Sequence, residues 1–162
     1  MDDLIEEWKN ANKSDKKAQV KLVKRLTDKK NKNIDEVANK AHQEVISKVD
    51  CLDCANCCTN IPPMLVRSDI KRIAKHLRLK EAQFTEQYLT MDNDGDMVMR
   101  TSPCVFLGHD NKCDIYEVRP KACRQYPHTD AYEFRNNSNL HAINSRYCPA
   151  VYHILKRLES II

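Results

Sequence analysis

The sequence predicts a small α+β protein that is mostly α-helical, with short irregular β structure. Apolar residues recur at helical spacing through the first 49 residues, and a turn at residues 92–96 leads into a short strand over residues 97–100. Eight cysteines begin at Cys51, four of them within residues 51–58. We therefore divide the chain into an amphipathic helical extension, residues 1–49, and a cysteine-cluster domain, residues 50–162, closed by a C-terminal helix.

Composition excludes several classes of function. The net charge of +4 comes from mixed basic and acidic residues, which predicts no nucleic-acid partner. The two glycines, Gly95 and Gly108, cannot form a glycine-rich phosphate loop. No apolar run approaches the ~18 residues of a membrane span, and the first residues lack a secretion signal, so we expect a cytoplasmic protein that does not bind membranes.

The N-terminal segment is expected to hold three helices. Trp8 lies in a first short helix, and Ser14 caps a second. Asn33 and Glu36 resemble a capping box that starts a third helix, which leads the chain into Cys51. Lysines cover the outer faces between residues 9 and 32, so a protein partner could bind these basic helices.

The middle of the chain predicts two further helices. Pro62 and Pro63 end the helical pattern after the first cysteines, because proline offers no backbone donor. Ser68 is expected to cap a helix with Ile70 and Ile73 on its apolar face, and another helix covers residues 80–90.

The last third alternates short elements with a long polar stretch. Cys104 and Cys113 are expected to flank a hairpin, and Pro120 to open a short helix. Residues 128–145 read as a mobile surface loop, and the histidines of the chain as surface side chains. Pro149 opens the last helix, with Cys148 at its cap.

The cysteines carry the chemistry of this sequence. Thiolates two residues apart on a turn can bind one metal ion or cluster, and in a reducing cytosol such spacings indicate metal rather than disulfides. Cys51, Cys54 and Cys57 match the first ligands of a ferredoxin-type run, but Ile61 occupies the position of the fourth. Further ligands must therefore come from later in the chain, and all eight cysteines are candidates: Cys51, Cys54, Cys57, Cys58, Cys104, Cys113, Cys123 and Cys148.

Two questions stay open at this point. Adjacent side chains point in different directions, so Cys57 and Cys58 either serve two centres, or one of them is a thiol beside the site. Spacing also does not choose between an iron-sulfur cluster, with [4Fe-4S] preferred, and zinc. Either centre is anionic, so we expect Arg119 and Arg124 to lie beside the cofactor and offset its charge.

Several motifs together resemble one family. They are C-x-x-C-x-x-C-C at 51–58, Pro103-Cys104, Cys113-Asp-Ile-Tyr116, Arg119-Pro120-x-x-Cys123-Arg124 and Cys148-Pro149. The sequence over roughly residues 50–150 resembles the YkgJ-like cysteine-cluster family, described as a zinc- or iron-chelating CxxCxxCC domain. That resemblance implies that all eight cysteines belong to the family pattern, and the cysteine block is also similar to that of flagellin lysine N-methylases.

The main hypothesis is a metal-binding protein that coordinates an iron-sulfur cluster or zinc through cysteine thiolates. We expect no stand-alone enzyme. If the chain is an enzyme, the methylase resemblance implies a cluster-dependent methyltransferase, and an electron-transfer protein is the other alternative. Ile61 interrupts the C-x-x-x-C-x-x-C pattern of a radical S-adenosylmethionine site, which limits the methyltransferase hypothesis.

Overall fold

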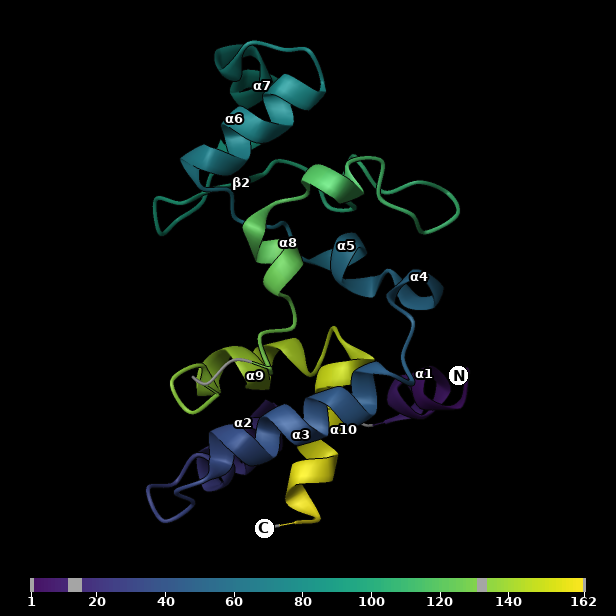
Figure 1. Cartoon of the computed structure of the whole chain (residues 1–162), viewed down its shortest axis with the longest axis vertical. Coiled ribbons are helices and arrows are strands. Elements are labelled where there is room, and N and C mark those ends of the chain that lie inside the picture. Colours follow the sequence, from purple (N-terminus) through teal and green to yellow (C-terminus); the bar gives the residue numbers. More distant parts are fainter. Residues whose placement is uncertain (1, 12–15, 131–133, 162) are drawn as a thin grey trace. The chain divides into compact units, whose positions relative to one another are not determined.

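The chain is mostly helical and has one two-stranded antiparallel sheet, which confirms the predicted fold class (Figure 1). The computed structural model describes residues 2–11, 16–130 and 134–161. These residues form two compact units, of which unit 1 comprises residues 1–51 and 127–162, and unit 2 comprises residues 52–126. No helix among the described residues has the length and apolar character needed to cross a bilayer.

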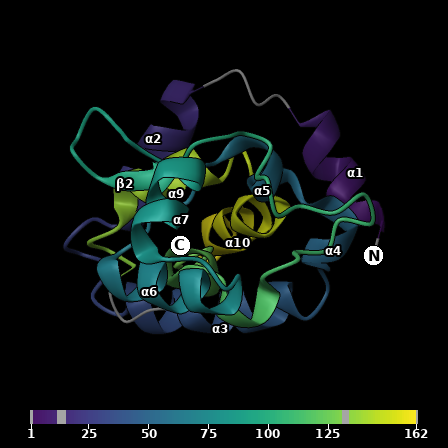
Figure 2. The same cartoon turned by 90° about the horizontal axis from the view of Figure 1, so that it is seen from above.

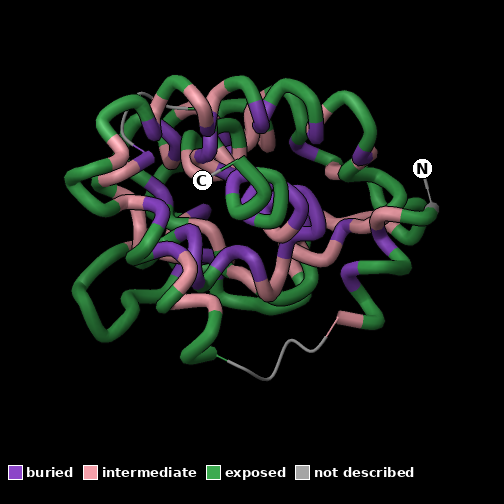
Figure 3. The backbone as a smooth tube through the Cα atoms, turned by 90° about the horizontal axis from the view of Figure 1, so that it is seen from below, coloured by how far each residue is buried: buried purple, intermediate pink, exposed green. Residues whose placement is uncertain are grey.

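The described residues of unit 1 form a helical bundle. Its helices are α1 (Asp2–Asn10), α2 (Lys16–Leu26), α3 (Ile34–Ile46), α9 (Ser138–Asn144) and α10 (Pro149–Glu159). Figure 2 looks onto α10, around which α1, α2, α3 and α9 are arranged, and α10 contacts all four. Figure 3 shows α10 as a largely buried stretch of backbone, in agreement with Val151, Ile154 and Leu158, which are fully shielded from solvent. The apolar side of the last helix is therefore the centre of this unit.

Polar contacts connect the two ends of the chain within unit 1. The indole Nε1 of Trp8 donates to the carbonyl of Ser145 at 3.1 Å. The guanidinium of Arg135 donates to the carbonyls of Thr27, Asp28 and Asn31 and so satisfies backbone acceptors after the end of α2. These bonds fix residues near position 140 against the N-terminal helices.

The predicted loop over residues 128–145 is wrong over residues 138–144. Ser138–Asn144 is helix α9, and Phe134 and His141 are fully buried, with their rings stacked 4.2 Å apart. His42, His141 and His153 are also buried, contrary to the expectation of surface histidines. The polar sequence concealed a helix that buries His141, Ala142 and Asn144, whereas its larger apolar residues, Leu140 and Ile143, are exposed. Residues 131–133 lie outside the described part.

Unit 2 contains short elements around its own core. They are α5 (Asn56–Asn60), α6 (Arg67–His76), α7 (Glu81–Tyr88), β1 (Leu89–Met91), β2 (Met97–Met99), the 3-10 helix η1 (Tyr116–Val118) and α8 (Lys121–Gln125), while α4 (Cys51–Cys54) begins at the last residue of unit 1. Leu89 pairs with Met99 in the sheet. The core is formed by Leu65, Ile73, Ala74, Phe84, Leu89, Met99, Phe106 and Ile115.

Two predicted helix caps differ in the structure. Asn33 precedes α3, but its side chain makes no capping hydrogen bond. The helix expected to follow the cap residue Ser68 begins two residues earlier, at Arg67, and the carboxylate of Asp69 accepts the backbone N–H of Val66 at 3.2 Å. Asp69 therefore caps α6. The expected cap residue Ser14 lies outside the described residues.

The compact units also divide the chain differently from the two predicted segments. The C-terminal helix α10 packs with the N-terminal helices in unit 1, whereas the sequence assigned it to the cysteine-cluster domain. The reason is physical: the apolar faces of α1, α2 and α3 need a partner to bury them, and α10 provides it.

Candidate metal centre

Four thiols from separate segments of unit 2 lie near one another. They are Cys58 on α5, Cys104, Cys113, and Cys123 on α8, and we call them the thiol cluster. Every pair within the thiol cluster is close enough for repulsion between two thiolates to affect a pKa. The fold therefore brings together thiols that are up to 65 positions apart in the sequence.

Backbone conformation and backbone hydrogen bonds position Cys58 and Cys104 in the thiol cluster. Ala55 adopts a left-handed conformation, with φ of 45°, which allows the sharp turn between α4 and α5. The backbone N–H of Cys104 donates to the carbonyl of Cys58 at 2.9 Å, and the hydroxyl of Ser102 donates to the carbonyl of Thr59 at 2.8 Å. These two bonds place the Cys104 segment beside α5.

The predicted hairpin between Cys104 and Cys113 is present as a short ladder. The N–H of Gly108 donates to the carbonyl of Lys112 at 2.8 Å, and Leu107 forms a β-bridge with Cys113. A Cβ atom at Gly108 would lie 2.9 Å from the Asp110 carboxylate and 3.3 Å from the Lys112 carbonyl, so a side chain there would crowd the turn. Cys104 and Cys113 both pack against the core of unit 2.

A buried carboxylate positions the segment that carries Cys123. Asp69 is only 1% exposed, and its Oδ1 accepts from the Arg72 guanidinium at 2.5 Å and from the backbone N–H of Lys121 at 3.1 Å. Arg72 in turn donates to the carbonyls of Val118 and Arg119. Asp69 and Arg72 therefore connect α6 to the start of α8, two residues before Cys123. The sequence analysis missed both residues, although an acidic side chain at the third position of a helix is a recognisable capping signal.

The pKa values within the thiol cluster differ widely. The thiol of Cys57 donates a hydrogen bond to Cys58 and lowers the pKa of Cys58 to about 7. Burial raises the pKa of Cys123 to about 12, and repulsion from the other three thiolates acts in the same direction. Burial also raises the pKa of Cys104 and that of Cys113. Four thiolates are therefore unfavourable together without a cation, which is the chemistry of a thiolate metal site.

Arg119 provides a fixed positive charge near these thiols. Its guanidinium lies 3.7 Å from the centre of the Tyr116 ring and donates to the carbonyl of Tyr116 at 2.7 Å. Against the dominant effect of burial, Arg119 lowers the pKa of Cys113 and that of Cys123. The guanidinium of Arg124 donates to the carbonyl of Arg119 at 2.6 Å, so Arg124 contacts the backbone that carries this charge.

Of the other four cysteines, Cys57 contacts the thiol cluster through its hydrogen bond to Cys58. Cys54 and Cys57 are half-buried on α4 and α5 in unit 2, whereas Cys51 and Cys148 belong to unit 1. Cys148 is buried and precedes α10 at its cap, as predicted. All eight cysteines lie in the described part of the chain and are thiols rather than disulfides.

The thiol cluster contains the sulfur donors of a metal site, but the structure does not arrange them as a complete single-ion site. Among the described residues, no group of three or more histidine, cysteine, aspartate or glutamate side chains is gathered closely enough to hold one metal ion. The soft, anionic donor set fits zinc or iron. The chemistry of these residues therefore suits a metal centre.

The comparison with known families agrees with this donor set. Residues 50–149 match the CxxCxxCC family, whose description is "Putative zinc- or iron-chelating domain". The chain belongs to the CxxCxxCC family. The matched segment contains Cys51, the whole thiol cluster and Cys148, and it includes parts of both compact units.

A curated relative also matches this chain, and its description adds no activity. An uncharacterized protein of Methanocaldococcus jannaschii is 29% identical over 108 residues, which cover 63% of this chain and 57% of that protein. The match therefore spans little more than half of the relative's length. No solved structure matches this CxxCxxCC chain.

Proposed function

We propose that this chain binds an iron-sulfur cluster, of the [4Fe-4S] type, through the thiolates of Cys58, Cys104, Cys113 and Cys123. The observation that carries the proposal is the mutual electrostatic interaction of these four thiols, which come from four separate segments. Four cysteine thiolates are the ligand set of such a cluster, and the cluster would supply a redox-active or structural centre.

Four cysteine thiolates suit a [4Fe-4S] cluster and a tetrahedral zinc ion alike. We prefer the cluster because Cys51, Cys54 and Cys57 match the first three ligands of a ferredoxin-type run, although Ile61 stands at the position of the fourth.

Anaerobic purification with elemental analysis and a visible spectrum tests the cofactor. We expect iron and acid-labile sulfide in equal amounts and an absorption band that dithionite bleaches. Colourless protein with stoichiometric zinc would refute the cluster and leave zinc, the second candidate, at the same thiols.

Serine variants test the ligand set. Cys58→Ser and Cys123→Ser are expected to abolish cofactor loading, because each removes one of the four thiolates. Cys148→Ser is the matched comparison from unit 1, and we expect it to keep the cofactor. Cofactor loading of Cys54→Ser shows whether the Cys54 thiol, which lies in the same C-x-x-C run as Cys57, is also required for cofactor binding. Full loading of Cys123→Ser would show that the ligands are different ones.

An electron-transfer role is the second candidate for the function of such a centre. Val105 and Tyr116 are half exposed, at 50% and 51%, and they lie close in sequence to Cys104 and Cys113. Exposed apolar side chains beside a redox centre suit a small, transient contact with a redox partner. Measured reversible reduction of the loaded protein would support this role, and loss of the cofactor on reduction would exclude it.

A further inference from the structure

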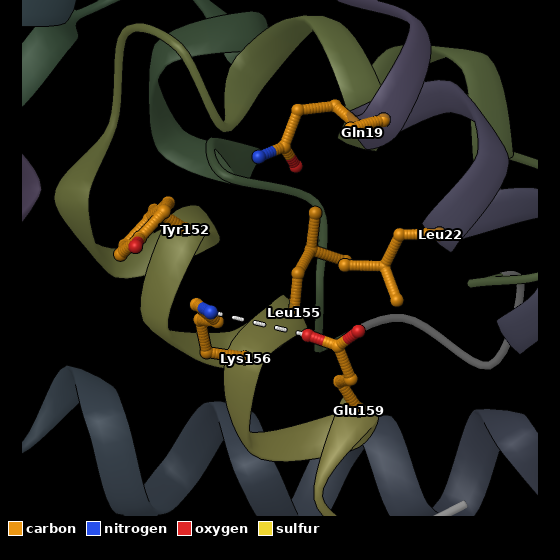
Figure 4. Close-up of a pocket in the computed structure, with 7 residues that line it drawn as sticks. Gln19, Leu22, Tyr152, Leu155, Lys156 and Glu159 are labelled. Atoms are coloured by element: carbon orange, nitrogen blue, oxygen red, sulfur yellow. Dashed lines mark ion pairs between the residues drawn. The ribbon is translucent and has the colours of Figure 1, made fainter. Parts of the chain in front are cut away.

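A surface pocket lies between α2 and α10, wholly within unit 1 (Figure 4). It has a volume of about 170 Å³, and engineered cavities of about 150 Å³ accept a benzene-sized group. It is therefore large enough for one apolar side chain. The lining residues are Ala18, Gln19 and Leu22 from α2, and Tyr152, Leu155, Lys156 and Glu159 from α10.

The acidic residue at this pocket is already neutralised. Glu159 pairs with Arg25 at 2.9 Å and with Lys156 at 4.0 Å, and Figure 4 marks the second of these pairs. Gln19 accepts a hydrogen bond from the Ser145 hydroxyl at 3.4 Å. Ala18, Leu22 and Leu155 give the pocket an apolar part, while Lys156 and Glu159 form a charged rim without uncompensated negative charge.

A row of cations lies on the exposed side of α2 next to the side that lines the pocket, about 100° around the helix from Ala18 and Leu22. Helix α2 contains no acidic residue. At 100° per residue, Ala18 and Leu22 face the pocket, while Val23 and Leu26 face the core. The exposed cations lie on the side of the helix that faces away from the core. They are Lys17, Lys21, Lys24 and Arg25. The three lysines make no ion pair with any residue in the described part of the chain.

We propose that this pocket and its lysine edge bind an acidic peptide segment of another protein. One apolar side chain of the segment fills the pocket, and carboxylates on either side of it pair with Lys17 and Lys21. Charge complementarity selects the partner class, because apolar pockets of this size recur on many surfaces whereas an all-basic helix edge does not. The site is separate from the thiol cluster, so the proposal does not depend on the cofactor.

The chemistry of the surface favours a peptide over nucleic acid or lipid. The edge is made mainly of lysines, which act as point charges and lack the planar fork with which arginine grips phosphate. Tyr152 is the only aromatic residue in the pocket lining, so the pocket does not provide a row of rings for stacking bases. A concave pocket for a single side chain also differs from the broad apolar face that a membrane-bound helix presents.

Synthetic peptides on the full-length chain test the proposal. The probe is a fluorescein-labelled peptide with a central leucine between runs of glutamate, and the comparison peptide carries serine in place of leucine. We expect the leucine peptide to bind about tenfold more tightly, and raising salt from about 0.05 M to about 0.5 M to weaken both. Amide NMR shifts should change on α2 and α10.

Matched variants distinguish binding at this pocket from non-specific electrostatic attraction between the acidic peptide and the basic protein. The double variant K17E/K21E should lose about tenfold or more in affinity, whereas K71E/K75E, an exposed lysine pair with the same spacing on α6, should not. Ala18→Gln should fill the pocket and remove the preference for leucine, while Ala82→Gln on an exposed face of α7 should not. The proposal is overturned if neither peptide binds, or if both peptides bind equally well. It is also overturned if the two lysine double variants lose the same affinity, or if duplex DNA of the same charge binds more tightly than the leucine peptide.

Discussion

At the scale of single residues, the thiols of one cluster differ greatly in acidity. The pKa of Cys58 is lowered to about 7 by the Cys57 hydrogen bond, and burial raises the pKa of Cys123 to about 12. At neutral pH, the metal-free chain therefore exposes one reactive thiolate next to thiols that keep their protons. A metal cation that meets this site binds a ready thiolate first and must displace protons from the other three.

Alkylation measures this difference directly. In the metal-free chain, we expect the reaction of Cys58 with iodoacetamide to be half-maximal near pH 7, because half of its thiol is then deprotonated. Cys123 should stay unmodified until far more alkaline pH. Cys57→Ala should move the Cys58 midpoint upward, toward the ordinary value of about 8.5, and Cys54→Ala should not. Peptide mass spectrometry across a pH series gives each rate, and equal rates for Cys58 and Cys123 at pH 7 would contradict the assignment.

Arg119→Gln is expected to weaken metal binding at neutral pH. Arg119 lowers the pKa of two thiols, Cys113 and Cys123, so its removal makes their deprotonation harder. Metal binding releases these protons, so the apparent zinc affinity of Arg119→Gln at pH 7 should be about tenfold lower than that of the unchanged protein. This difference in affinity should become smaller as pH rises, because the thiols then lose their protons without help from Arg119. Chelator competition at two pH values measures both effects. Arg67→Gln, an exposed arginine at the start of α6, is the control; an equal loss in that variant would assign the effect to net charge.

At the scale of elements, Asp69 connects two helices that the sequence treats separately. The buried carboxylate caps α6 and accepts the backbone N–H of Lys121 at the start of α8. Removing one partner of a buried, hydrogen-bonded ion pair is costly, since Arg72 and two backbone N–H groups lose their acceptor.

We expect Asp69→Ala to destabilise unit 2 by about 3 kcal/mol and to reduce cofactor loading through misplacement of Cys123. Asp69→Asn should be intermediate, because it keeps an oxygen acceptor but loses the charge that faces Arg72. Hydrogen exchange at the amides of α6 and α8 reports the stability, and cofactor content reports the site. Glu81→Ala, which removes an exposed carboxylate from the first turn of α7, should cost less than about 0.5 kcal/mol. Unchanged exchange in Asp69→Ala would contradict this role.

At the scale of the whole molecule, cofactor removal should affect part of unit 2. The sheet and helices α6 and α7 have an apolar core of their own, with Ile73 and Phe84 fully buried. The hairpin between Cys104 and Cys113, and α8, contain few such residues and depend more on a bound cofactor. Chelation should therefore increase hydrogen exchange over residues 102–125 while α6, α7 and unit 1 stay protected. Uniform loss of protection, or none, would contradict this division.

Sequence periodicity predicts most of the helices, because their apolar faces repeat at helical spacing. The sequence also supplies the candidate donor atoms of the proposed site, since thiols are recognisable wherever they stand. It does not predict which thiols gather, because the dense run at 51–58 draws attention to local spacing, while the grouping of Cys58 with Cys104, Cys113 and Cys123 depends on a hairpin and on Asp69. It also misses α9, where the burial of Phe134 and His141 outweighs a polar composition.

Unit 1 is assembled from both ends of the chain, and unit 2 is inserted between them. During synthesis, α1, α2 and α3 leave the ribosome long before α10, so their apolar faces stay uncovered until the last helix emerges. The segment with the thiol cluster is complete earlier, by Tyr126. The thiols of the nascent chain are therefore complete as a set before the apolar faces of unit 1 are covered.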